Sequence, residues 1–173
     1  MMIEASLLIV FPCLVAYAAT SDLFTMTIPN RVSLLLVAGF AALAPFVPLS
    51  LPDAGYHLLA GVCVFAVGFT LFACGWMGGG DVKVAAAIAL WFGFSEPLFG
   101  FLFLSAVYGA VLTLALLLFR NKIPVLPGIA SGQSWLVRLH DRNTGIPYGI
   151  ALSLAALQVY PETVWFQALV AAS

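Results

Sequence analysis

The chain has 173 residues, of which 64% are hydrophobic and only 8% are Asp, Glu, Lys or Arg. This composition excludes an ordinary soluble globule and gives no basic surface for nucleic acid, and it predicts one membrane domain over residues 1–173. The apolar stretches are long and do not alternate with polar residues, which favours helices over a barrel. We therefore expect an all-α fold, a polytopic membrane protein of about six transmembrane helices.

Six apolar stretches follow one another along the chain. We expect the first to be a retained helix rather than a signal peptide, because residues 1–4 carry no cation. A hairpin turn at Ser95-Glu96-Pro97 is expected to separate the fourth from the fifth, since one continuous helix there would be too long for a bilayer. The expected spans are residues 3–20, 31–49, 57–75, 82–95, 97–119 and 146–169.

The charged residues predict how these spans are oriented. All six cations lie in or beside the connections between spans 1 and 2, 3 and 4, and 5 and 6: Arg31, Lys83, Arg120, Lys122, Arg138 and Arg142. The other connections and ends carry only acids, namely Glu4, Asp53, Glu96 and Glu162. By the positive-inside rule, the cationic connections face the cytoplasm and both termini lie outside.

Gly78-Gly79-Gly80-Asp81 places a carboxylate beside an apolar span, where an ionised acid is costly and indicates a functional site. Asp22, at the end of the first span, lies on the same predicted side of the membrane. Two neighbouring carboxylates cannot both ionise cheaply and therefore share a proton, as in aspartic proteases. The structural alternatives are that Asp22 is a helix-end residue and that Asp81 is the N-cap of the fourth span.

Other chemistry has little support in the sequence. The three cysteines, Cys13, Cys63 and Cys74, fall within spans without the spacing of metal ligands. His57 and His140 fall on opposite sides of the membrane. We therefore expect no metal and no other cofactor.

Two functions of other classes stay open on these residues. One is a small proton-coupled transporter or channel in which Asp81 carries protons on a broken helix. The other is an assembly or scaffold protein without chemistry.

Three motifs, in chain order, resemble those of the type IV prepilin peptidases, which are membrane aspartic proteases of the GxGD group. Residues 78–83 are similar to the GxGDxK motif, Asp22 followed by Ile28-Pro29-Asn30 to the first-aspartate region, and Ile146-Pro147-Tyr148-Gly149 to the Pro-Tyr-Gly signature of the last helix. The resemblance implies that Asp22 and Asp81 are the catalytic pair. It also implies cleavage at the cytoplasmic boundary of the bacterial inner membrane, after a Gly that ends the short basic leader of a prepilin.

The resemblance also suggests which branch of the family is concerned. Larger members carry a cytoplasmic domain with paired CxxC motifs and methylate the new terminus, but the connection of residues 21–30 contains no cysteine. We therefore expect no methyltransferase or zinc domain, and a likeness to the small peptidases of tight-adherence (Flp) pilus systems. The implied partners are prepilin and pseudopilin substrates and the lipid bilayer. An archaeal preflagellin peptidase is a neighbouring interpretation, and the oligomeric state is unknown.

The glycines and the lysine of the first motif receive supporting roles. Gly78 and Gly80 are expected to act through backbone conformation, leaving Asp81 on a bendable and uncrowded backbone. Lys83 is expected either to assist the pair of aspartates electrostatically or to anchor the helix end at the membrane surface.

The other two motifs contribute residues that begin helices. Pro29 and Asn30 are expected to shape the start of the second span, because Pro suits a first helical turn. Pro147, Tyr148 and Gly149 open the last span, and Tyr148 has the position of an interfacial aromatic.

Overall fold

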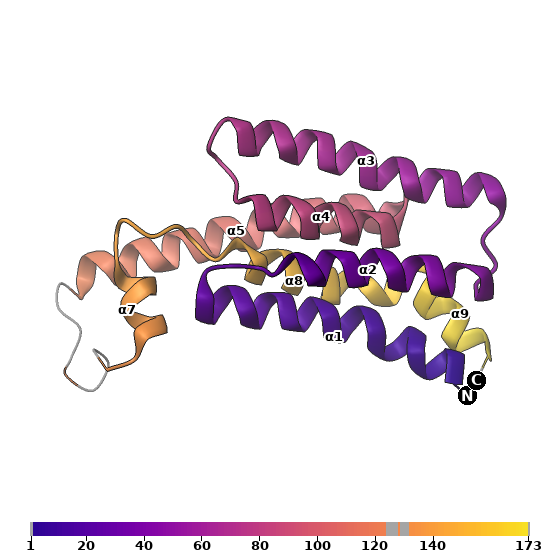
Figure 1. The fold of residues 1–173 in the computed structure, drawn as a ribbon, viewed down its shortest axis with the longest axis horizontal. Coiled ribbons are helices and arrows are strands. Elements are labelled where there is room, and N and C mark those ends of the chain that lie inside the picture. Colours follow the sequence, from indigo (N-terminus) through magenta and orange to yellow (C-terminus); the bar gives the residue numbers. More distant parts are fainter. Residues whose placement is uncertain (1, 124–127, 129–131, 173) are drawn as a thin grey trace.

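Figure 1 shows the computed structural model of the chain, which describes residues 2–123, 128 and 132–172. The α-helices are α1 (Met2–Thr25), α2 (Asn30–Leu43), α3 (Leu51–Ala73), α4 (Gly79–Phe92), α5 (Glu96–Lys122), α7 (Ser134–His140), α8 (Tyr148–Val159) and α9 (Val164–Ala172). Two short 3-10 turns, η1 (Ala44–Phe46) and η2 (Tyr160–Glu162), follow α2 and α8. The all-α prediction is confirmed for the described part of the chain.

The helices follow the expected spans, with three differences. α1 runs on to Thr25, which shortens its connection with α2 to residues 26–29. The turn between α4 and α5 is made at Gly93, whose φ is +66°, so that Glu96 already begins α5. The expectation of one continuous last span is wrong: Pro161 lies in η2, between α8 and α9, where it cannot continue a helical hydrogen-bond ladder.

The lengths of the helices bear on the number of spans. In the described residues, α3 and α5 are long and apolar enough to cross a membrane. α2 and α4 have 14 residues each. At a rise of 1.5 Å per residue, 14 residues extend about 21 Å, less than the ~30 Å hydrocarbon layer. Two spans are therefore supported by length, and the predicted count of six stays a prediction.

The helices run roughly along one axis, so that their turns gather at two ends (Figure 1). The α1–α2 turn, the α3–α4 turn and α7 lie at one end. The two termini, the α2–α3 turn and the α4–α5 turn lie at the other. This alternation brings the end of α1 and the start of α4, and with them Asp22 and Asp81, to the same end of the molecule.

Helix α4 forms the centre of the bundle and packs against α3 and α2. It is buried over most of its length, and many of its residues are alanines that permit close approach of neighbouring helices. On α3, Gly68 faces Val82: an added Cβ at Gly68 would lie 2.9 Å from the Val82 Cγ1. The first turns of α4 are therefore held tightly against α3.

Aromatic side chains fill the core at the end away from α7. The indole N–H of Trp91 on α4 donates to the carbonyl of Leu36 on α2 at 2.8 Å. The indole N–H of Trp165 on α9 donates to the carbonyl of Trp91, and the two rings lie 4.6 Å apart. Phe11 on α1 packs against Trp91 with a centroid distance of 5.1 Å. One side chain of α4 thus contacts three other helices.

Replacing Trp91 with Ala is expected to lower the free energy of unfolding by about 3–5 kcal/mol, because a large cavity opens and the bond to Leu36 is lost. The measurement is denaturant unfolding of the purified protein in detergent micelles. Trp76, which is 79% exposed, offers a matched control. Trp76→Ala is expected to change stability by less than about 0.5 kcal/mol, and equal losses in the two variants would contradict the central role of Trp91.

Candidate active site

Asp22 lies in the last turn of α1 and is almost fully buried, with 5% of its surface exposed. Its Oδ2 accepts a hydrogen bond of 2.8 Å from the backbone N–H of Gly149. Gly149 is in the first turn of α8, whose N-cap residue, Pro147, makes no side-chain cap. The first N–H groups of a helix lack partners within the helix and favour negative charge. Asp22 therefore caps α8 from a distant part of the chain.

Asp81 also accepts a hydrogen bond from the backbone at a helix N-terminus, in this case that of its own helix, α4. It lies in the first turn of that helix, after the N-cap residue Gly78, and its carboxylate accepts a hydrogen bond from the Gly78 N–H. This is one half of a capping box, in which a first-turn acid reaches back to the N-cap backbone. The N-cap alternative from the sequence is thus partly right: Asp81 caps α4, although Gly78 is the N-cap residue.

The two carboxylates face one cavity of about 880 Å³. Both are shielded from bulk water, since Asp22 is buried and Asp81 is half-buried. The cavity is bounded by α1, the α3–α4 turn, α4, α5, α8 and the segment before α8. Among the described residues, no group of three or more His, Cys, Asp or Glu could hold a metal ion. The chemistry that this arrangement can perform is acid–base chemistry by two carboxyl groups that share a proton.

Tyr148 closes one side of the cavity. Its hydroxyl donates to the backbone carbonyl of Ser105 on α5 at 2.9 Å. Its ring lies against Gly109, where an added Cβ would be 2.1 Å from the Tyr148 Cε2. Tyr148 is half-buried between α5 and α8 and lines the cavity with the aspartates, and its place at the membrane interface stays a prediction.

Comparison with known proteins identifies the family. A family model described as the type IV leader peptidase family matches residues 9–114, more than half of the chain. The chain belongs to the type IV leader peptidase family. The prepilin leader peptidase/N-methyltransferase of Bacillus subtilis (strain 168) is 34% identical over 135 residues, which cover 72% of this chain and 52% of that protein. The chain thus spans about half the length of this curated relative, and no solved structure matches it.

The family match covers part of the cavity. Asp22, Asp81 and Ser105 lie within residues 9–114, whereas Tyr148 and Gly149 lie beyond them. The structure joins the two parts through the Gly149–Asp22 and Tyr148–Ser105 hydrogen bonds.

The glycines of the leader-peptidase motif have ordinary backbone conformations. Gly78 has φ −71° and ψ 141°, and Gly79 and Gly80 are helical. The expected action of Gly78 and Gly80 through backbone conformation stays a prediction. The space beside Gly78 is occupied by Asp81, since an added Cβ there would lie 2.8 Å from the Asp81 Oδ2, whereas one at Gly80 would make an ordinary contact of 3.4 Å with the Ile28 Cβ.

Lys83 and Asn30 pair with each other away from the cavity. The Lys83 Nζ donates to the Asn30 Oδ1 at 2.8 Å, which links the first turns of α4 and α2. Both residues line a separate apolar groove of about 550 Å³ with α3. Pro29 is the N-cap residue of α2, one position before the predicted first turn. The bond to Asn30 is neither of the two roles expected for Lys83, and both stay predictions.

Three further cavity residues were missed by sequence reasoning. Met26 follows α1 with φ +55°, a left-handed conformation that is costly for a residue with a side chain. The Ser105 hydroxyl is buried and has no hydrogen-bond partner within the described residues. Arg120 is only 6% exposed. Sequence reasoning assigned Arg120 to the charge asymmetry alone, and no local pattern distinguishes these three residues from their neighbours.

Replacing Gly109 with Ala is expected to cost about 1–3 kcal/mol, because the new methyl group would overlap the Tyr148 ring. Thermal unfolding in micelles measures the loss. Gly100→Ala on the same helix is the matched control, since its nearest contact, Val159 Cγ2, would be 3.7 Å away. Tyr148→Ala in the same chain should remove the penalty at Gly109, and a penalty that persists there would show that the ring contact is not its cause.

Proposed function

We propose that this chain is an aspartic-type endopeptidase with Asp22 and Asp81 as its catalytic pair, and that it removes the leader peptides of type IV prepilins. The observation that carries the proposal is that α1 and α4 present these two carboxylates to one cavity. Membership of the type IV leader peptidase family supports the choice of peptide hydrolysis among the reactions open to such a pair.

The pair acts through one shared proton. The ionised carboxylate takes a proton from a water molecule in the cavity, while the protonated one donates a hydrogen bond to the carbonyl oxygen of the scissile peptide. Water then attacks the carbonyl carbon, and the C–N bond breaks as the carboxyl group that took the proton from water gives it to the leaving amine nitrogen. Both carboxylates are held by backbone N–H groups at helix N-termini, from Gly149 and Gly78, so neither needs to reorganise when charge moves between them.

The substrates proposed are Flp-type prepilins and pseudopilins. The connection between α1 and α2 is residues 26–29, so no cysteine-bearing domain is inserted between the helix of Asp22 and α2. The cavity lies at the end of the bundle to which the cationic turns belong, which supports cleavage at the cytoplasmic boundary of the bacterial inner membrane with both termini outside. A basic leader would reach the cavity from that side.

No observation favours the transporter alternative over the peptidase. A second broken helix does exist, at η2 between α8 and α9. Its residues do not line the cavity of Asp22 and Asp81, and its acid, Glu162, is exposed. The interruption therefore adds no second acid to a pathway through the bundle.

Asp22→Asn and Asp81→Asn are each expected to abolish processing, by about a thousandfold or more, because an amide cannot carry the shared proton. The measurement is conversion of a co-expressed Flp-type prepilin to its mature form, followed by the mass of the new terminus. Inserted, folded protein should be present in equal amounts in all strains.

Glu96→Gln is the matched control for this experiment. Glu96 is an exposed acid at the start of α5, at the opposite end of the bundle. Its replacement should leave processing unchanged. Full processing in either aspartate variant would overturn the assignment of the pair.

A further inference from the structure

Arg120 is a buried cation in the last turn of α5, and it lines the cavity that contains Asp22 and Asp81. A buried charge is costly unless it is hydrogen-bonded. Three other cations at this end of the molecule are exposed, namely Lys122, Arg138 and Arg142. Burial therefore separates Arg120 from residues that only set the orientation of the chain.

The guanidinium group binds one short segment of the chain, residues 139–145. Its Nε donates to the Leu139 carbonyl at 2.7 Å, and one terminal nitrogen donates to the Thr144 carbonyl at 3.3 Å. The other terminal nitrogen donates to the Gly145 carbonyl at 3.0 Å and to the Thr144 hydroxyl at 3.4 Å. In return, Arg142 donates to the Arg120 carbonyl at 3.4 Å. The end of α5 and this segment are thus held together from both sides.

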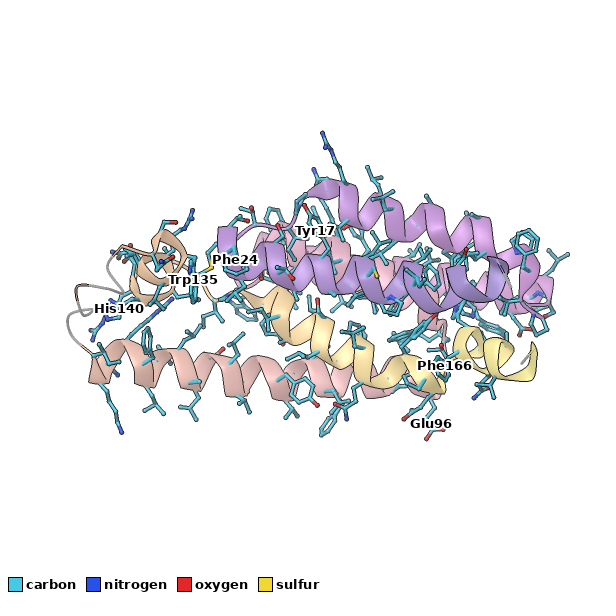
Figure 2. The ribbon with its side chains drawn as sticks, turned by 90° about the horizontal axis from the view of Figure 1, so that it is seen from below. Tyr17, Phe24, Glu96, Trp135, His140 and Phe166 are labelled. Atoms are coloured by element: carbon cyan, nitrogen blue, oxygen red, sulfur yellow. The ribbon has the colours of Figure 1, made fainter. Side chains whose placement is uncertain are left out.

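Ring contacts hold α7, the helix just before this segment, against the ends of α1 and α5. Phe24 of α1 meets Trp135 of α7 edge to face at 5.6 Å, and Phe119 of α5 meets His140 of α7 at 5.6 Å. Figure 2 shows Trp135 beside Phe24, and His140 at the end of α7 near the end of α5. α7 therefore bridges the ends of α1 and α5, and Arg120 fixes the chain where it leaves α7.

The segment that Arg120 holds leads directly into α8. Gly149 follows Gly145 by only four positions, which limits the distance between them to about 14 Å, and Pro147 restricts the backbone between them. We infer that Arg120 is a positioning residue: by binding the carbonyls of residues 139–145, it holds the N-terminus of α8 so that the Gly149 N–H stays on Asp22. The catalytic consequence rests on the proposed function, whereas the positioning of Gly149 does not.

The guanidinium shape is essential to this role. Arg presents its donors as a rigid planar fork and reaches several acceptors at once, whereas Lys presents its donors from one point. Arg120→Lys keeps the charge but cannot bind the carbonyls of residues 139, 144 and 145 together. A role in charge alone predicts that Lys substitutes for Arg, and a positioning role predicts that it does not.

Hydrogen exchange of the backbone amides of residues 148–152, measured in micelles, tests the positioning directly. Arg120→Gln and Arg120→Lys should each speed exchange of the Gly149 amide about tenfold or more. Arg138→Gln, which removes an exposed cation from α7, is the matched control and should leave exchange unchanged. Unchanged exchange in Arg120→Gln, or full protection in Arg120→Lys, would overturn the inference. If Arg120→Gln does not fold, Arg120→Lys, which keeps the charge, carries the test, and full protection of the Gly149 amide in that variant overturns the inference.

Prepilin processing by the same variants tests the consequence for catalysis. Both Arg120 variants should lower kcat about a hundredfold per folded enzyme with KM unchanged, because displacement by about 1 Å of a catalytic group has an effect of that size. A purely structural role would reduce the amount of folded enzyme and leave its kcat intact. If the wild-type chain processes no prepilin, the proposed function fails, while the exchange measurement still decides whether Arg120 positions Gly149.

Discussion

The hydrogen bond between the Gly149 N–H and Asp22 joins the start of the chain to its last motif, and the site depends on it. It gives the buried carboxylate a partner and gives α8 the cap that Pro147 cannot supply. Asp81 is held in a similar way, by the backbone at the start of α4. Each acid is thus bound by a backbone N–H at a helix N-terminus. This N–H replaces a hydrogen bond from water, and the apolar side chains around the acids could not supply one.

Close contacts made possible by glycine bring these helix ends together. Ile28, between α1 and α2, lies close to Gly149, where an added Cβ would be 2.7 Å from the Ile28 Cδ1. Gly109 receives the ring of Tyr148. A larger residue at these positions would separate the helices that carry the acids from those that cap them. The glycines therefore act by their size, and their backbone conformations are ordinary.

The sequence shows the helices and the two aspartates because each leaves a strong signal. Long apolar stretches mark the helices, and Asp22 and Asp81 stand out because an acid beside an apolar span is expensive. The break at Pro161 and the burial of Arg120 were missed for different reasons. Pro161 is a local signal, but it lies within a long apolar run that predicts a single span. Arg120 is buried only because residues 139–145 fold back over it, and such long-range contacts leave no periodicity in the sequence.

The order of the helices along the chain has a consequence for biosynthesis. Chains are made and folded from the N-terminus, so α1 and α4, with both acids, exist before α8 emerges. Until then Asp22 has no Gly149 amide to bind and Tyr148 does not wall the cavity. A nascent chain thus carries its two acids without a completed site. Because α8 is made after the helices of both acids, the site proposed for them is complete only once α8 has been synthesised.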